Sequence, residues 1–296
     1  MFNLKHLILL FVIAPITTQS YALSIGELHH QMRVVTSEVI VLKKQKAAAV
    51  QTRAFGVQVG KTKLHAYIKG IELLEKISRY QQQNNLPPLA IPDLPLKRVK
   101  SKNILVIVQL AATQMREINA AANLIATPVK KDTSSKTASD LYGEILQASY
   151  LMDSLLEPTN LAQVMRNNNR IERGLADIAK RLNKPVNSIQ LSTYTDKKAE
   201  DVTLGLYKLL YKLAHLQRKL KIKPLVVPNF PTGTILAEDA NDTAGSVIAD
   251  LTRIAHKLKI APIKTESESS VVQNVNVNSV YAQVVRLNHS AQLLFK

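Results

Sequence analysis

The sequence predicts an all-α protein made of two tandem, duplicated four-helix-bundle-like units, about eight helices in all, joined by Pro-rich loops. Three observations lead to this prediction: apolar residues recur with a helical period, one stretch of the first half repeats in the second, and glycine is scarce. Only 9 of the 296 residues are Gly, which argues against Gly-rich phosphate loops and most all-β folds. A hydrophobic fraction of 46% excludes wholesale disorder.

Capping residues and prolines divide the chain into its predicted helices. Ser24 and Glu27 have the spacing of a capping box at the start of the first helix. Proline follows or closes most of the others, because it lacks an amide hydrogen and crowds the preceding turn. The predicted helices span residues 24–48, 64–84, 102–125, 139–156, 160–183, 200–221, 238–259 and 279–295.

The helical period is clearest in segment 200–221. Its apolar residues recur at i, i+3, i+4 and i+7 and therefore lie on one side of a helix. They are Val202, Leu206, Leu209, Leu210, Leu213, Leu216 and Leu220. Segment 271–277 is different, because apolar and polar residues alternate strictly in it. This alternation predicts a short strand or an extended linker.

The duplication is inferred from a gap-free alignment of segment 64–95 with segment 200–231, a shift of 200 − 64 = 136 residues. The Pro-rich loop PLAIPDLP of the first segment falls on PLVVPNFP of the second, with all three prolines in register. Leucines match by chance in helices, but three registered prolines in a loop do not. We therefore expect one helical unit at residues 23–157 and a second at residues 158–296.

The N-terminal residues 1–22 have the pattern of a cleaved signal peptide. Lys5 is followed by an apolar stretch from Leu7 to Ile16, and small residues precede a cleavage site after Ala22. An uncleaved anchor is the alternative, but the apolar stretch is short for a bilayer crossing, and no later segment is long enough either. The sequence thus predicts a periplasmic or secreted protein with no transmembrane segment after cleavage.

A basic charge balance points to an anionic partner. The chain has 39 Lys and Arg against 22 Asp and Glu, a net charge of +17. Basic residues cluster on one face of the 200–221 helix and after the first Pro-rich loop: Lys208, Lys212, His215, Lys219, Lys97 and Arg98. An envelope protein, an anionic polymer or a lipid headgroup fits such a surface. The alternative is an ordinary solvated helix face, and export argues against nucleic acid.

Three tyrosines near predicted helix starts are candidates for a ligand pocket at a bundle end. They are Tyr67, Tyr142 and Tyr281. The alternative is that each ring packs in the core and its hydroxyl reaches a loop carbonyl, because structural repeats also repeat structural residues. The Pro-rich loops have the same two interpretations: a ligand rim or a stiff connector.

The sequence favours neither a metal site nor an enzyme. With no Cys in the chain, disulfides, thiolate metal ligands and thiol catalysis are excluded. His29 and Met32 share a helix face, but one such pair has too few ligands for copper or zinc. No nucleophile motif is present, so we predict neither catalytic residues nor a cofactor.

The leading functional hypothesis is therefore an exported, non-enzymatic binding or scaffold protein of the bacterial envelope. A periplasmic small-ligand binder with a pocket in or at the end of a bundle is the first alternative. An enzyme of unrecognised type, with carboxylates or histidines converging in one cleft, is the second.

Overall fold

The computed structural model describes residues 24–46, 57–95, 98–157, 161–185, 193–261 and 275–295. These residues form eight α-helices and no strand, which confirms the all-helical class. The helices are α1 (Ile25–Gln45), α2 (Lys63–Gln83), α3 (Ser101–Ala121), α4 (Ala138–Asp153), α5 (Leu161–Arg181), α6 (Ala199–Lys219), α7 (Ala237–Leu258) and α8 (Val277–Leu293). The predicted signal peptide lies outside the described residues.

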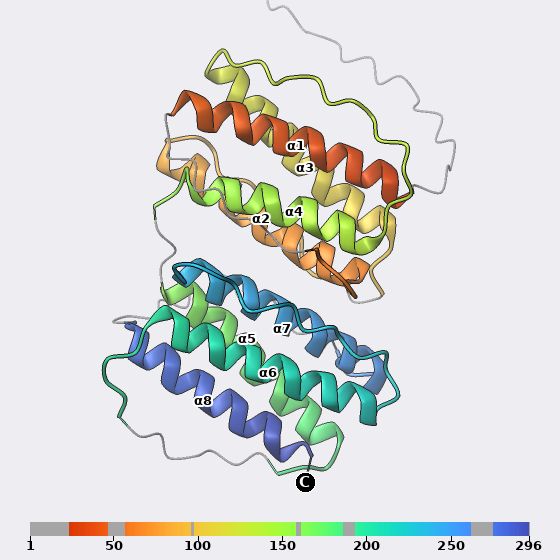
Figure 1. Ribbon diagram of the computed structural model, residues 1–296, viewed down its shortest axis with the longest axis vertical. Coiled ribbons are helices and arrows are strands. Elements are labelled where there is room, and N and C mark those ends of the chain that lie inside the picture. Colours follow the sequence, from red (N-terminus) through yellow and green to blue (C-terminus); the bar gives the residue numbers. More distant parts are fainter. Residues whose placement is uncertain are drawn as a thin grey trace, which may run out of the picture.

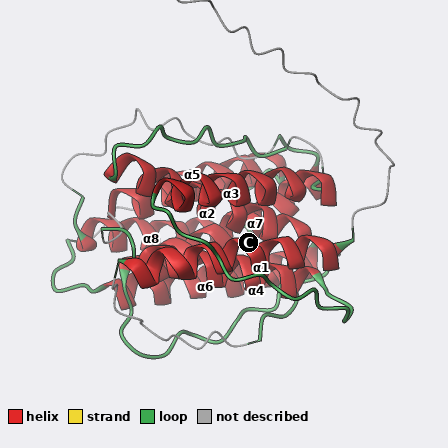
Figure 2. Cartoon of the chain, turned by 90° about the horizontal axis from the view of Figure 1, so that it is seen from above, coloured by secondary structure: helices red, strands yellow, loops and turns green. Residues whose placement is uncertain are grey.

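The helices gather in two groups of four, α1–α4 and α5–α8, stacked one on the other (Figure 1). In the first group, α1 and α2 each pack against α3 and α4. In the second, α5 and α6 each pack against α7 and α8. Each group has its own apolar core, and the helices run along a roughly common direction (Figure 2).

Helix α2 packs against α7 and joins the two groups. Ile68 on α2 contacts both apolar cores. On α7, Gly245 lies opposite, and an added Cβ there would be 3.9 Å from the Ile68 side chain. The small residue lets the two helices approach closely, and the surface between them is where the charged groups described below are buried.

The helix ends follow local chemistry that the sequence contains. The predicted capping box at α1 is confirmed: Ser24 Oγ accepts from the Glu27 amide at 3.2 Å, and Glu27 Oε2 accepts from the Ser24 amide at 3.0 Å. Just past the ends of α2 and α3, Asn85 and Asn123 have φ of 56° and 54°, a left-handed conformation that asparagine tolerates. The described part of the alternating segment is not a strand, because Asn276 caps α8 and Val277 begins it.

Of the helices in the described segments, none combines the length and the apolar character that a bilayer crossing requires.

Gly70 marks a close approach of α2 to α3. A Cβ at this position would be 2.6 Å from Cγ2 of the buried Ile107. We expect Gly70→Ala to lower the free energy of unfolding by about 1–3 kcal/mol, because the destabilisation from overpacking exceeds the stabilisation from the higher helix propensity of alanine. Denaturant unfolding measures the change.

Gly143→Ala on α4 is the matched control for Gly70→Ala. The nearest atom to its added Cβ, Cγ of Gln58, is at 3.7 Å, an ordinary van der Waals distance. This substitution is expected to stabilise the protein by about 0.5–1 kcal/mol. Equal effects of the two substitutions would contradict the close packing of α2 on α3.

Candidate functional site

A half-open cleft of about 490 Å³ lies where the two helix groups meet. One side is formed by the segment before α2 and by α4, both in the first group. The other is formed by α6, α7 and the second Pro-rich loop. The cleft has the size of ordinary small-molecule sites, which are hollows lined by apolar and aromatic side chains with few polar groups.

The second Pro-rich loop forms an apolar and aromatic wall of the cleft. Tyr207 on α6 and Phe230 in the loop meet edge to face, with ring centroids 5.1 Å apart. The Tyr207 hydroxyl donates to the carbonyl of Asn229 at 3.0 Å and fixes the loop against the helix. Pro228 and Pro231 line the same wall, so this loop is a rim of the cleft as well as a connector.

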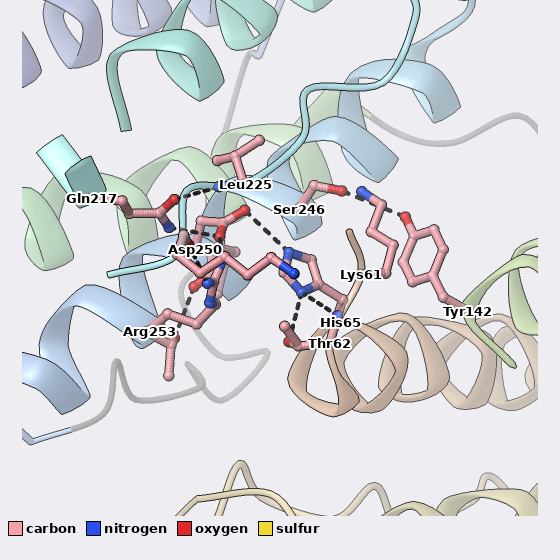
Figure 3. A network of polar contacts seen from close by, with 12 residues as sticks. Lys61, Thr62, His65, Tyr142, Gln217, Leu225, Ser246, Asp250 and Arg253 are labelled. Atoms are coloured by element: carbon pink, nitrogen blue, oxygen red, sulfur yellow. Dashed lines mark hydrogen bonds and ion pairs between the residues drawn. The ribbon is translucent and has the colours of Figure 1, made fainter. Parts of the chain in front are cut away.

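The opposite side of the cleft combines an aromatic ring, a cation and hydroxyl groups. Tyr142 on α4 lines the cleft, and the ammonium of Lys61 lies 4.7 Å from the centre of its ring. The hydroxyl oxygens of Tyr142 and Ser246 are 3.5 Å apart, linking α4 to α7. Figure 3 shows the Lys61 side chain reaching toward this contact.

A buried ionic cluster lies next to the cleft and holds the two groups together. Lys69 on α2 is 2% exposed, and its Nζ lies 2.7 Å from Glu72 Oε2 and 2.9 Å from Asp242 Oδ1 on α7. Lys76 Nζ lies 2.7 Å from Asp153 Oδ1 on α4 and 3.6 Å from Glu72 Oε1. Asp242 belongs to both places: it binds Lys69 and also lines the cleft.

The number of charged groups in this cluster indicates that one of its carboxyl groups is protonated. Two lysines face three carboxyl groups, so the cluster is neutral when one carboxyl is protonated. Burial and then repulsion from Asp242 raise the pKa of Glu72 to about 8, although Lys69 opposes the shift. For Asp242, burial acts to raise the pKa, but Lys69, a hydrogen bond with Glu72 and Lys76 outweigh it and hold the pKa below its usual range. Glu72 therefore holds the proton at neutral pH.

The fifth member of the cluster, Asp153, is ionised at neutral pH. Burial is the largest influence and raises its pKa to about 6, while the nearby Lys76 ammonium acts in the opposite direction. With Glu72 neutral, two lysines balance two carboxylates. Such a balanced arrangement is needed in a dry interface, because an unpaired buried charge is costly.

A second buried network joins α2, α6 and α7 (Figure 3). His65 Nδ1 accepts from the Thr62 amide at 3.2 Å, so its Nε2 carries the hydrogen and donates to Asp250 Oδ2 at 3.1 Å. Asp250 Oδ1 also accepts from Gln217 at 2.8 Å and from Arg253 at 2.6 Å. Burial, more than the opposing pull of Asp250, lowers the pKa of His65 and keeps it neutral.

Of the three tyrosines predicted to form a pocket, Tyr142 lines this cleft and the other two do not. The Tyr67 hydroxyl donates to the carbonyl of Asp93 in the first Pro-rich loop at 2.8 Å. Tyr281 meets Tyr194 edge to face, with centroids 5.0 Å apart. The Tyr67 contact has the geometry of the structural alternative, a buried ring whose hydroxyl reaches a loop carbonyl, whereas the Tyr281 ring packs partly buried against the second apolar core.

The predicted basic face on α6 is partly engaged by the C-terminal region. Lys212 Nζ donates to the carbonyl of Asn288 at 2.8 Å, and Lys219 Nζ donates to that of Phe295 at 3.2 Å. The His215 ring meets the Phe295 ring edge to face at 4.9 Å. Lys208 is exposed. In the second basic run Arg98 is exposed, whereas Lys97 lies outside the described residues.

Sequence reasoning missed the cluster residues Lys69, Glu72 and Asp242, and the cleft residues Lys61 and Phe230. One signal was available for the cluster. Lys69, Glu72 and Lys76 follow i, i+3, i+7 and therefore form a charged stripe on one face of the helix, although the sequence alone does not show whether that face is buried. No three His, Asp or Glu side chains converge as a metal-binding group within the described residues.

Comparison with known proteins adds no relative: no protein-family model, curated protein or solved structure matches this chain.

Proposed function

We propose that this chain is an exported, non-enzymatic helical protein that binds a small ligand in the cleft between two duplicated four-helix units. The observation that carries the proposal is the cleft of about 490 Å³ itself, walled by Tyr142, Tyr207 and Phe230 and lying against the buried ionic cluster. Aromatic walls beside convergent polar groups suit selective binding of a small molecule.

Export is supported by the sequence of residues 1–22, with its basic start, apolar stretch and cleavage site after Ala22. In a cell envelope, a ligand-binding protein of this kind meets small molecules that have crossed the outer boundary of the cell.

Tandem duplication of units 23–157 and 158–296 is supported by side-chain contacts at matching positions. Lys61 lies over the Tyr142 ring at 4.7 Å, and Lys197 lies over the Tyr281 ring at 4.8 Å. The two lysines are 136 residues apart and the two tyrosines 139. The four helices of each group also pack in the same pairwise order.

A polar pair deeper in each unit repeats as well. Gln81 donates to Gln114 at 2.5 Å in the first unit, and Gln217 donates to Asp250 at 2.8 Å in the second. Both members of the second pair are displaced by 136 residues from the first. One change between the copies, Gln114 to Asp250, is what lets α7 engage His65 of the other unit.

Binding is favoured over catalysis because His65, the best candidate for acid–base chemistry, is buried and both of its ring nitrogens are already hydrogen-bonded. Thr62, His65 and Asp250 are arranged in a row that resembles a hydrolytic triad, with Thr62 Oγ1 2.9 Å from His65 Nδ1. The same His65 Nδ1 also accepts the Thr62 amide, as in a capping box at the start of α2. His65 is 2% exposed, so a substrate cannot reach the ring.

A second candidate, contact with an anionic partner, is favoured by the outward face of α6. Lys208 and His215 are exposed there beside Leu204 and Tyr211, which are 44% and 62% exposed. This combination of basic and apolar side chains suits an envelope polymer or lipid headgroup surface. It ranks second because Lys212 and Lys219 of the same face already bind carbonyl groups of the C-terminal region.

Native mass spectrometry of the protein purified gently from its own host tests the ligand proposal. We expect an added small mass that is lost on denaturation. Thr232→Trp places a large side chain at the mouth of the cleft, where Thr232 is exposed, and is expected to reduce the bound fraction at least several-fold.

Ile91→Trp, in the first Pro-rich loop and away from the cleft, is the matched control and should retain the ligand. A wild-type protein without any adduct, or equal occupancy in the Thr232 and Ile91 variants, would contradict binding in the cleft.

A further inference from the structure

Acidic residues outnumber basic residues among the described residues that line the cleft. Among the described lining residues, Asp239 and Asp242 carry carboxylates and Lys61 alone carries an ammonium. Asp242 is only 26% exposed, with Oδ1 held by Lys69, so a part of its carboxylate still faces the cleft. Asp239 Oδ2 accepts the Leu236 amide at 2.9 Å and is fixed in place at the start of α7.

Because the neighbouring ionic cluster is neutral as a whole, the net charge of the cleft depends on Asp239 and Lys61. With a proton on Glu72, the lysines at 69 and 76 balance the carboxylates at 242 and 153. Asp239 is then matched by Lys61. If the Lys61 side chain swings out, the cleft is left with one net negative charge and the face of the Tyr142 ring is uncovered.

Lys61 is well placed to swing. It lies just before α2, and its backbone amide is fixed by a 3.0 Å hydrogen bond to Ser139 Oγ. Its four methylene groups can move without that anchor, because the side chain is partly exposed. An ammonium over an aromatic face beside carboxylates is also the arrangement by which proteins recognise organic cations.

We infer that the ligand of this cleft is an organic cation, with an ammonium group on an aromatic or apolar body, and that the Lys61 ammonium occupies the same place as a tethered competitor. The inference rests on the proposed function, because it names the chemistry of a ligand for the cleft. The body of the ligand would pack against Tyr207 and Phe230, and its ammonium would replace Lys61 over Tyr142.

A bound anion is disfavoured by the same residues. Among the described lining residues, an anionic group would have Lys61 as its one cationic partner and would lie beside two carboxylates. The two classes of ligand therefore predict opposite effects of removing Lys61: an organic cation gains affinity when its competitor is removed, whereas an anion loses its partner.

Isothermal titration calorimetry separates these cases with three probes that share a phenyl ring on a short alkyl chain and differ in charge. The probes are 2-phenylethylammonium, 2-phenylethanol and 3-phenylpropionate. In the wild-type protein we expect the ammonium probe to bind most tightly. In Lys61→Met its affinity should rise by about 2- to 30-fold, the range that follows from the strength of a cation–π contact, while the affinity for 2-phenylethanol should change little.

Lys197→Met is the matched control, because Lys197 makes the same contact with Tyr281 at 4.8 Å but does not line the cleft. It should leave all three affinities unchanged. Tightest binding of 3-phenylpropionate, with weaker binding in Lys61→Met, would overturn the cation inference and leave the ligand proposal intact.

Failure of all three probes at millimolar concentration, with a small molecule still present in the native mass spectrum, would also overturn the inference alone. If the native spectrum shows no adduct and no probe binds, the proposed function itself fails.

Discussion

Replacing Lys69 with methionine is expected to lower the free energy of unfolding by about 3–5 kcal/mol, the cost of breaking a buried ion pair from one side. Lys69 is 2% exposed and lies within 2.9 Å of both Glu72 Oε2 and Asp242 Oδ1. Methionine fills a similar volume but carries no charge. The cluster then keeps one more carboxylate than lysines even with Glu72 protonated, and Asp242, which loses its lysine, is largely buried.

A double variant separates charge from packing. Lys69→Met with Asp242→Asn leaves Lys76 paired with Asp153 and Glu72 protonated, so the cluster is neutral again. We expect this variant to recover most of the stability that Lys69→Met loses. Lys63→Met, whose ammonium donates to Ser101 Oγ at 2.9 Å near the start of the same helix, is the control and should change stability by about 0.5 kcal/mol or less.

Denaturant unfolding at neutral pH measures all three variants. If the single and double variants at Lys69 are equally unstable, the loss comes from packing and the ionic account of this interface is wrong.

Helix positions were predictable because they depend on local signals. The segment 64–84 was predicted from apolar spacing and the Asn84-Asn85 break before Pro87, and α2 runs from Lys63 to Gln83. Left-handed φ at Asn85 ends it, a conformation that asparagine adopts readily. The prediction for 200–221 compares in the same way with α6, Ala199–Lys219. These signals lie within a few residues of the ends that they set.

The cleft and the cluster were not predictable because they depend on which helix covers which. Lys69 and Glu72 are three residues apart, a spacing that is typical of an ion pair on a solvated helix face. Their burial depends on α7, which brings Asp242 from the other half of the chain. Likewise, the α6 lysines have the spacing of an exposed stripe, and only the docking of α8 shows that Lys212 binds a carbonyl.

Glu72→Gln is expected to change how stability depends on pH. The pKa of Glu72 is raised from 4.5 to about 8, chiefly by burial, so between these values the folded protein holds a proton that the unfolded chain has lost. The unfolded state binds fewer protons, and wild-type stability therefore falls as pH rises through this window, by up to about 1.4 kcal/mol per pH unit from this group. Glutamine keeps the shape and a hydrogen-bond donor but does not titrate.

The difference in unfolding free energy between Glu72→Gln and the wild type should accordingly rise from pH 5 to pH 8 in favour of the variant, and level off above pH 8. Taking the difference cancels the titration of groups that the substitution leaves alone. Carbon-13 NMR of the Glu72 carboxyl should give a midpoint near pH 8. A difference that does not vary with pH, together with a carboxyl midpoint near its ordinary value, would mean that the proton is not on Glu72. If Asp242 and Asp153 are ionised as well, the cluster then carries a net negative charge against the cleft, which would strengthen its preference for a cation while weakening the contact between α2 and α7.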